Sequence, residues 1–216
     1  MFQFIYMKEN CIAPFIGISR HRLATDGVGV TTLAAFWGCP LKCRYCLNPQ
    51  SLTKETKTKS YSPEEFYQIV KIDQLYFLAT GGGITFGGGE PYLYTDFIKE
   101  FRICCGKEWN ITIETSLFTP LQNIQSLLPV VDNYIIDIKD INKEIYKKYT
   151  GKTNKLPVFN LKYLVEQGKA DKIRVRVPLI PNFNSEKDNE NTILALKKMG
   201  IKEIETFSYL LKQKKL

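Results

Sequence analysis

The stretch Tyr134-Ile135-Ile136-Asp137-Ile138-Lys139 decides the fold of this 216-residue chain. Its apolar start is typical of a strand that is covered on both faces, as in a parallel sheet between helices. Because side chains alternate along a strand, Asp137 and Lys139 share one face and Ile138 lies on the other. Charges on a buried central strand are paired or functional. The stretch therefore predicts a central strand and, at its end, one part of a site.

Strand-like and helix-like segments alternate on both sides of this strand. The other expected strands cover residues 31–37, 82–86, 111–115, 172–179 and 203–210. Helices are expected from Ser62-Pro63, over 94–105 with a buried side of Phe97, Ile98, Phe101 and Ile103, over 121–128, around 161–167 and over 186–199. Such alternation implies right-handed crossovers and a parallel sheet. We therefore expect an α/β fold with one domain over residues 1–216, in which residues 1–30 are an N-terminal extension and residues 31–210 form a partial (β/α)6 TIM-like barrel.

The composition, 44% hydrophobic and 24% charged, is that of an ordinary globular protein. The net charge of +8 comes from lysines that are spread over helical segments, with only short clusters such as Lys147-Lys148. This spread argues against nucleic-acid binding. A basic funnel for an anionic cofactor is compatible with it. The apolar residues Met1 to Met7 lack the basic start and cleavage site of a signal peptide. No apolar run reaches the roughly 20 residues of a membrane span. We expect a cytoplasmic protein with no membrane partner.

Three of the six cysteines, Cys39, Cys43 and Cys46, lie within eight residues directly after the first expected strand. In a reducing compartment such a cluster indicates a soft metal rather than disulfides. A structural zinc site takes four protein ligands and an ordinary iron-sulfur cluster takes four cysteines, and no fourth ligand is nearby here. An open position is typical of a catalytic metal site. The alternative is a zinc site completed by Cys11, Cys104, Cys105 or His21, whose roles the sequence leaves open.

Two further segments fall at expected strand ends. Gly88-Gly89-Glu90 follows the strand of 82–86, and glycines let the main chain approach a ligand closely, although a tight loop would look the same. Arg174 and Arg176 share a face of their strand. They could hold an anionic carboxylate with the guanidinium fork, or they could belong to a salt-bridged barrel interior.

Together these residues resemble the radical S-adenosylmethionine (SAM) superfamily, which has the spacing Cys-x3-Cys-x2-Cys. Within it, they resemble the glycyl-radical-enzyme activases, of which the pyruvate formate-lyase activating enzyme is the best known. The resemblance covers about residues 18 to 185 and rests on Asp26-Gly27-Val28-Gly29, the loop from Gly38 to Pro49, Asp137-Ile138-Lys139, Tyr149-Thr150-Gly151 and the segment from Arg176 to Pro181.

The resemblance implies a set of roles and a reaction. Cys39, Cys43 and Cys46 would ligate a [4Fe-4S] cluster; Gly88, Gly89 and Glu90 would hold the methionine amine of SAM, and Lys139 and Arg176 its carboxylate; Glu114, Thr115 and Asp137 would bind a monovalent cation; Asp26 would touch the substrate peptide. Reductive cleavage of SAM would give a 5′-deoxyadenosyl radical that abstracts hydrogen from a glycine of a partner glycyl radical enzyme. A flavodoxin or ferredoxin would donate the electron.

The chain departs from the family pattern at several points. Leu47 stands where the family usually has His, Val28 where it has Pro, and Glu114 where the pyruvate formate-lyase activase has Asp. No eight-cysteine insert follows the loop, so we expect the short form without an auxiliary ferredoxin domain. Members commonly continue through a Leu-Pro-Tyr-His segment, which this sequence lacks, so the substrate side stays open. Two alternatives remain: a radical SAM maturase of a peptide or small molecule, and a zinc-stabilised interaction domain without enzymatic activity.

Overall fold

Eight strands form a single sheet in this computed structural model, which describes residues 11–23 and 25–209. The strand order is β3-β1-β2-β4-β5-β6-β7-β8. The strands are β1 (Ala13–Leu23), β2 (Val30–Phe36), β3 (Lys59–Tyr61), β4 (Gly83–Gly88), β5 (Asn110–Thr115), β6 (Asn133–Asp137), β7 (Ile173–Leu179) and β8 (Glu203–Ser208). Neighbouring strands from β2 through β8 pair in parallel, whereas β1 pairs antiparallel with both β2 and β3.

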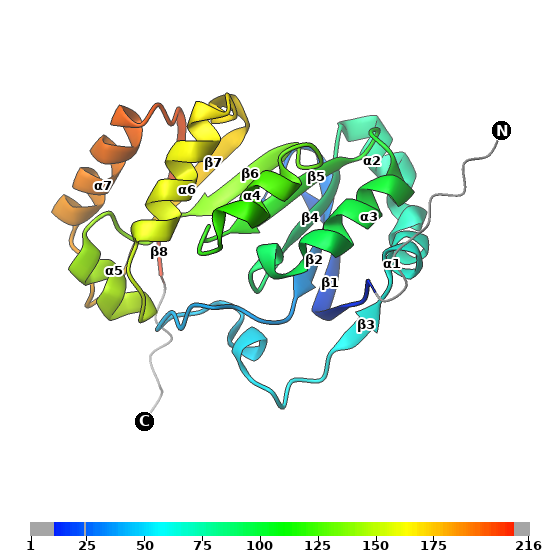
Figure 1. Cartoon of the computed structure of the whole chain (residues 1–216), viewed down its shortest axis with the longest axis horizontal. Helices are drawn as coiled ribbons and strands as arrows, with labels where there is room; N and C mark the ends of the chain where they lie inside the picture. Colours follow the sequence, from blue (N-terminus) through cyan, green and yellow to red (C-terminus); the bar gives the residue numbers. More distant parts are fainter. Residues whose placement is uncertain (1–10, 24, 210–216) are drawn as a thin grey trace.

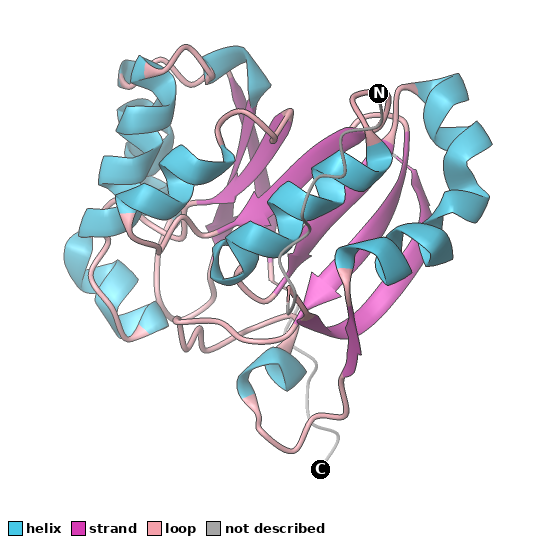
Figure 2. Cartoon of the chain, turned by 45° about the vertical axis from the view of Figure 1, so that its right-hand side comes forward, coloured by secondary structure: helices cyan, strands magenta, loops and turns pink. Residues whose placement is uncertain are grey.

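The six parallel strands confirm the predicted α/β architecture. The sheet is twisted and open, with helices packed along it, as expected for a partial barrel (Figures 1 and 2). Residues 13–23, which the sequence placed in an extension, form β1 of the same sheet. The mixed burial along β1 explains the difference, because its second half is largely exposed and lacks the apolar run of a central strand. The first ten residues of the expected extension and Leu210 lie outside the described residues.

Helices connect the parallel strands, and none among the described residues is long and apolar enough to cross a membrane. They are α1 (Pro63–Val70), α2 (Gln74–Thr80), α3 (Thr95–Cys105), α4 (Leu121–Leu127), α5 (Lys143–Thr150), α6 (Lys155–Glu166) and α7 (Glu186–Lys198), with short 3-10 turns η1 (Pro49–Leu52), η2 (Lys71–Asp73), η3 (Pro91–Tyr94) and η4 (Ala170–Lys172). The expected start of α1 is confirmed, because Ser62 and Glu65 form a capping box. Helix α5 was not expected from the sequence; it is a polar helix of two turns whose N-terminal amides are capped by Asn142.

One expected core residue of α3 is wrong. Phe97, Ile98 and Phe101 are buried, but Ile103 is 51% exposed. Two residues along a helix correspond to a rotation of about 200°, so Ile103 lies on the side opposite Phe101. Cys105, one turn after Phe101, is buried instead.

An aromatic core lies against the strands that carry the site. Phe36 stacks on Phe86 at 5.3 Å between ring centroids, and Phe15 stacks on Phe66 at 5.0 Å. Phe97 of α3 meets both Phe36 and Phe86 edge-on. Aromatic pairs of this kind contribute about 0.5–1.5 kcal/mol each beyond their buried area. The core therefore fixes the ends of β2 and β4 relative to each other.

A buried carboxylate ties η2 to the antiparallel edge of the sheet. The fully buried Asp73 accepts hydrogen bonds from Arg20 Nε at 2.7 Å and from Thr32 Oγ1 at 3.3 Å, and its Oδ1 lies 2.9 Å from His21 Nε2. The Arg20 hydrogen bond holds the pKa of Asp73 below its ordinary value of 3.8, although burial opposes this.

We predict that Asp73→Asn lowers the free energy of unfolding at pH 7 by about 1–3 kcal/mol, because Arg20 loses its charged partner. The folded-state pKa is lowered, so this contribution is present above the unfolded-state pKa and is lost as the pH falls through the folded-state pKa. Chemical denaturation at pH values from 7 to 3 should therefore show the free energies of unfolding of the wild type and of Asp73→Asn converging below about pH 4. A difference in unfolding free energy that widens on acidification would contradict the assignment. The control is Asp171→Asn, which removes an exposed ion pair.

Candidate active site

A cavity of about 280 Å³ opens at the carboxyl ends of the parallel strands. In parallel architectures this edge is where ligands bind. Eleven of the twelve residues to which the family resemblance assigns roles line it, and Asp26 does not. The eleven are Cys39, Cys43, Cys46, Gly88, Gly89, Glu90, Glu114, Thr115, Asp137, Lys139 and Arg176.

The loop that carries the cysteines leaves β2 and reaches across to α5 (Figure 1). Backbone hydrogen bonds hold it at its start and in its middle: Gly38 N–H donates to the Ser51 carbonyl at 3.0 Å, and the N–H groups of Lys42 and Arg44 donate to the carbonyls at the end of α5 at 3.0 and 3.1 Å. Leu41 anchors the loop in the interior at 2% exposure. The cysteines are thus positioned by the fold itself.

The thiols of Cys39 and Cys43 have raised pKa values in the protein without metal. Burial raises the pKa of Cys39 to about 12, and the nearby Glu90 adds to this shift. Burial also raises the pKa of Cys43 to about 11, although Lys139 opposes it. Ligation requires thiolates, so a group that loads here must release these protons.

The donor set fits an iron-sulfur cluster better than a single ion. Among residues 11–23 and 25–209, no three His, Cys, Asp or Glu side chains converge where one ion could be held. The three thiols nevertheless line one cavity, which is the arrangement for a larger group that leaves a position open. Of the proposed zinc-completing residues, His21 pairs with Asp73 and Cys105 bonds to carbonyls at the end of α3.

The glycine-rich end of β4 packs against the cysteine loop without room for side chains. Gly89 N–H donates to the Phe36 carbonyl at 2.9 Å, and Glu90 N–H donates to the Gly38 carbonyl at 2.8 Å. A Cβ at Gly89 would lie 2.0 Å from the Gly38 carbonyl oxygen, and one at Gly88 2.6 Å from the Ala35 Cβ. Because Gly88 and Gly89 both line the cavity and carry no side chain, bare main chain borders it, as a backbone cradle for a ligand requires.

We predict that Gly89→Ala destabilises the protein by about 1–3 kcal/mol, because the new methyl group must displace rigid backbone of the cysteine loop. Thermal unfolding measures the loss. Gly17→Ala is the matched control, since a Cβ there meets no atom within 4 Å. Equal stability of the two variants would show that the two segments do not pack as described.

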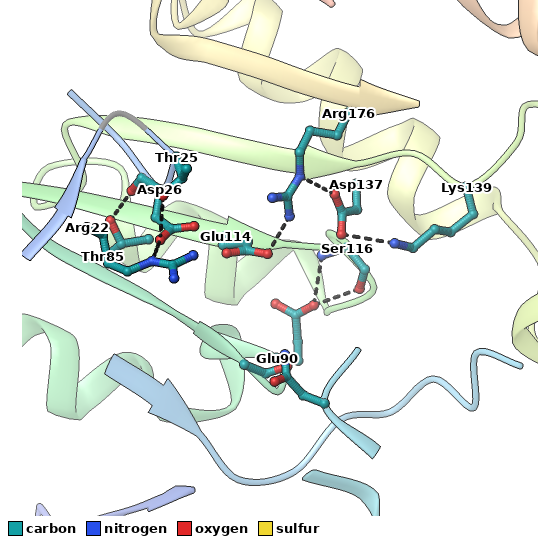
Figure 3. A network of polar contacts seen from close by, with 12 residues as sticks. Arg22, Thr25, Asp26, Thr85, Glu90, Glu114, Ser116, Asp137, Lys139 and Arg176 are labelled. Atoms are coloured by element: carbon teal, nitrogen blue, oxygen red, sulfur yellow. Dashed lines mark hydrogen bonds and ion pairs between the residues drawn. The ribbon is translucent and has the colours of Figure 1, made fainter. Parts of the chain in front are cut away.

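The Glu90 side chain fixes the neighbouring strand. Its side chain is fully buried and accepts hydrogen bonds from Thr115 Oγ1 at 2.6 Å and from Ser116 Oγ at 2.7 Å (Figure 3). Burial raises the pKa of Glu90, while these hydrogen bonds oppose the shift. The carboxyl group thus connects the end of β4 to the end of β5, while the Glu90 main chain bonds to the start of the cysteine loop.

Four charged side chains form a paired network, three on the adjacent strands β5, β6 and β7 and the fourth, Lys139, two residues past the end of β6 (Figure 3). Arg176 Nε donates to Asp137 Oδ1 at 2.7 Å, and its other arm donates to Glu114. Lys139 Nζ donates to Asp137 Oδ2 at 2.9 Å. Burial opposes ionisation of Asp137, but Lys139 and Arg176 outweigh it and hold its pKa below the usual value, whereas burial raises the pKa of Glu114. Two cations therefore face two carboxyl groups.

Two residues do not join this network. Arg174, considered with Arg176 as a cationic pair, forms an ion pair with Glu203 and lies outside the cavity lining. Arg174 lies two residues before Arg176 on β7, and therefore about 6–7 Å farther from the carboxyl end of the strand, where the cavity opens. Asp26 is buried and accepts a hydrogen bond from Arg22, while its carbonyl accepts one from Thr85.

Several lining residues were not identified from the sequence. Ser116 holds Glu90, and Asn48 Nδ2 donates to the Gly88 carbonyl at 3.3 Å. Glu205, Phe207 and Tyr209 line the cavity from β8 and the residue that follows it. The spacing of Glu205, Phe207 and Tyr209 at every second position could have identified them from the sequence, since such residues share one face of a strand.

A comparison with protein families identifies the chain. The model described as the radical SAM superfamily matches residues 36–212. The chain belongs to the radical SAM superfamily. This membership implies S-adenosylmethionine and a [4Fe-4S] cluster as cofactors, and the predicted resemblance to this superfamily is confirmed.

Curated relatives of this radical SAM protein are activating enzymes. It is 29% identical to the (2S)-3-sulfopropanediol dehydratase activating enzyme of Klebsiella oxytoca, over 76% of this chain and 70% of that enzyme. It is 32% identical to the pyruvate formate-lyase-activating enzyme of Listeria monocytogenes, over 72% of this chain and 64% of that enzyme. The radical SAM chain thus spans about two thirds of the length of these relatives.

A solved structure supports the radical SAM fold. Streptococcus suis SuiB bound to S-adenosylmethionine superposes with a TM-score of 0.60 at 17% identity, over 83% of this chain and 38% of SuiB. At that identity the likeness concerns the fold alone.

Proposed function

We propose that this protein is a glycyl-radical-enzyme activating enzyme, which uses SAM and a [4Fe-4S] cluster to abstract hydrogen from a glycine of a partner enzyme. One observation carries the proposal: three cysteines of one loop, a bare glycine strand end and a set of charged strand tips surround a single cavity. The names of the curated relatives support the class of partner.

In this proposal Cys39, Cys43 and Cys46 ligate the cluster. The backbone carbonyls of Gly88 and Gly89 hold the methionine amine, and the Glu90 side chain positions that segment through β5. When bound, the cluster supplies one electron that cleaves a carbon-sulfur bond of SAM. The protein's own task is to bind and orient, and no side chain is needed as a general base for hydrogen-atom abstraction.

Lys139 and Arg176 hold the SAM carboxylate in this proposal, and both are already paired with Asp137 or Glu114. A third carboxylate in this network would leave two positive charges against three negative ones. A monovalent cation at Glu114, Thr115 and Asp137 would restore neutrality, which supports the predicted cation site. The Thr115 hydroxyl at present donates to Glu90 and would offer its lone pairs to the cation.

The partner's peptide and the electron donor complete the proposal. Asp26 would approach the peptide only if its contact with Arg22 rearranges, since it is 5% exposed. A flavodoxin or ferredoxin would supply the electron.

Electron paramagnetic resonance tests this function. Anaerobically reconstituted protein, a reductant and SAM should generate a glycyl doublet in a glycyl radical enzyme encoded beside it. The same partner with its radical-site glycine replaced by alanine should give no doublet. Cleavage of SAM without a doublet in any such partner would overturn the proposed target and favour a peptide or small-molecule substrate.

A further inference from the structure

A basic surface lies where the cysteine loop meets α5. Lys42 and Arg44 of the loop and Lys147 and Lys148 of α5 line a hollow of about 580 Å³, together with Glu144 and Gly151. We call these four cations the α5 basic surface. With one carboxylate among them, four positive charges give the hollow a net charge of +3.

The charges of this surface are available to a partner. All four cationic side chains are exposed. Within the part of the chain that the structure describes, none of them forms an ion pair with an acidic side chain. The ammonium nitrogen of Lys148 lies 5.5 Å from the centroid of the Phe183 ring. This surface contrasts with the cavity, where Lys139 and Arg176 are both neutralised.

The cysteine loop separates the α5 basic surface from the cavity. Cys43 lines the cavity, whereas its two neighbours in sequence, Lys42 and Arg44, line the hollow. The hydrogen bonds from Lys42 and Arg44 to the end of α5 hold this arrangement. A molecule docked on the surface is therefore separated from a predicted cluster ligand by little more than the loop itself.

We propose that the α5 basic surface docks an acidic one-electron carrier protein that reduces the cluster. The inference rests on the proposed function, because SAM cleavage consumes one electron that must come from outside the chain. The carrier is oxidised by one electron, the cluster is reduced by one, and no atom is transferred. Exposed charges spread over a loop and a helix suit a broad acidic protein face, whereas a small anion requires donors that converge on one point.

Lysines in the last turn of a helix also stabilise it by interacting with the helix dipole. The chain offers a matched control for this effect. Lys197 and Lys198 are likewise exposed in the last turn of α7, and neither lines the cavity or the hollow. A Lys197→Glu/Lys198→Glu variant has the same net charge and the same helix-end defect as Lys147→Glu/Lys148→Glu. It leaves the α5 basic surface intact.

Binding of a flavodoxin, as the acidic carrier, tests the inference on the cluster-loaded protein. At low ionic strength Lys147→Glu/Lys148→Glu should raise the dissociation constant for flavodoxin by about tenfold or more, and added salt should remove the difference from wild type. Lys147→Glu alone, which keeps the Lys148 contact with Phe183, should show a smaller weakening in the same direction. Unchanged affinity, or equal weakening by the α7 control, would overturn the proposal.

Reduction kinetics separate docking from chemistry. Stopped-flow bleaching of the cluster by reduced flavodoxin should slow by about tenfold in the double variant, whereas bleaching by dithionite should not change. Equal slowing with dithionite would refute a docking role. If the dithionite-reduced wild type failed to cleave SAM, the proposed function would fail, and the binding result would still decide the role of the surface.

Discussion

Replacing Cys43 with alanine is expected to abolish cluster binding and SAM cleavage while leaving the protein folded. Cys43 lies in the middle of the loop and lines the cavity with Cys39 and Cys46. No other cysteine lines the cavity, so the loop has no substitute ligand among the described residues. The fold should survive, because the loop is held by backbone hydrogen bonds and by Leu41 rather than by the thiols.

Iron and sulfide content per chain, the visible absorbance of the cluster and the yield of 5′-deoxyadenosine measure the effect. Cys104→Ala is the control, because Cys104 is partly buried at the end of α3 and outside the cavity. It should retain full cluster content. A Cys43→Ala protein that kept a normal cluster and normal SAM cleavage would refute the assignment of the loop.

Replacing Arg176 with glutamine should have the second large effect, on stability and on SAM binding together. Arg176 is the shared partner of Asp137 and Glu114, and its side chain is 17% exposed. Removing one partner of a buried ion pair costs about 3–5 kcal/mol, because the remaining charge is buried without compensation. Lys139 still neutralises Asp137, so the greater part of the cost arises at Glu114.

A second variant separates the two effects. In Arg176→Gln/Glu114→Gln the unpaired carboxylate is gone, so most of the lost stability should return, while SAM affinity should stay low if Arg176 binds the SAM carboxylate. Denaturant unfolding and SAM titration of the cluster-loaded protein provide the two readouts. Recovery of SAM affinity in the double variant would show that Arg176 acts only by neutralising Glu114.

The central strands were predictable because burial on both faces leaves an unmistakable apolar run, as in Tyr134-Ile135-Ile136. Strand β1 was not, because its second half is largely exposed and lacks an apolar run, and its pairing with β3, which places Phe15 opposite Lys59, is a long-range property. Helix α5 was missed for a similar reason, since only Tyr146, Tyr149 and Thr150 of its eight residues are buried.

Eleven residues of the cavity lining followed from the sequence, but their pairing did not. Alternation along a strand predicted that Asp137 and Lys139 share a face, and they form an ion pair. That Arg176 also bonds to Glu114, 62 residues away, depends on β5, β6 and β7 being neighbours in the sheet. The burial of the Glu90 side chain likewise depends on Ser116, whose position is set by where β5 ends.

The two hydrogen bonds from the cysteine loop to the end of α5 affect how the protein gains and loses iron. In small zinc domains the chain orders only when metal binds, so the conformational entropy of ordering opposes binding. Here folding has already ordered the loop. Oxidative loss of the cluster should therefore leave a folded apoprotein, and reinsertion of iron and sulfide should restore it without passage through the unfolded chain.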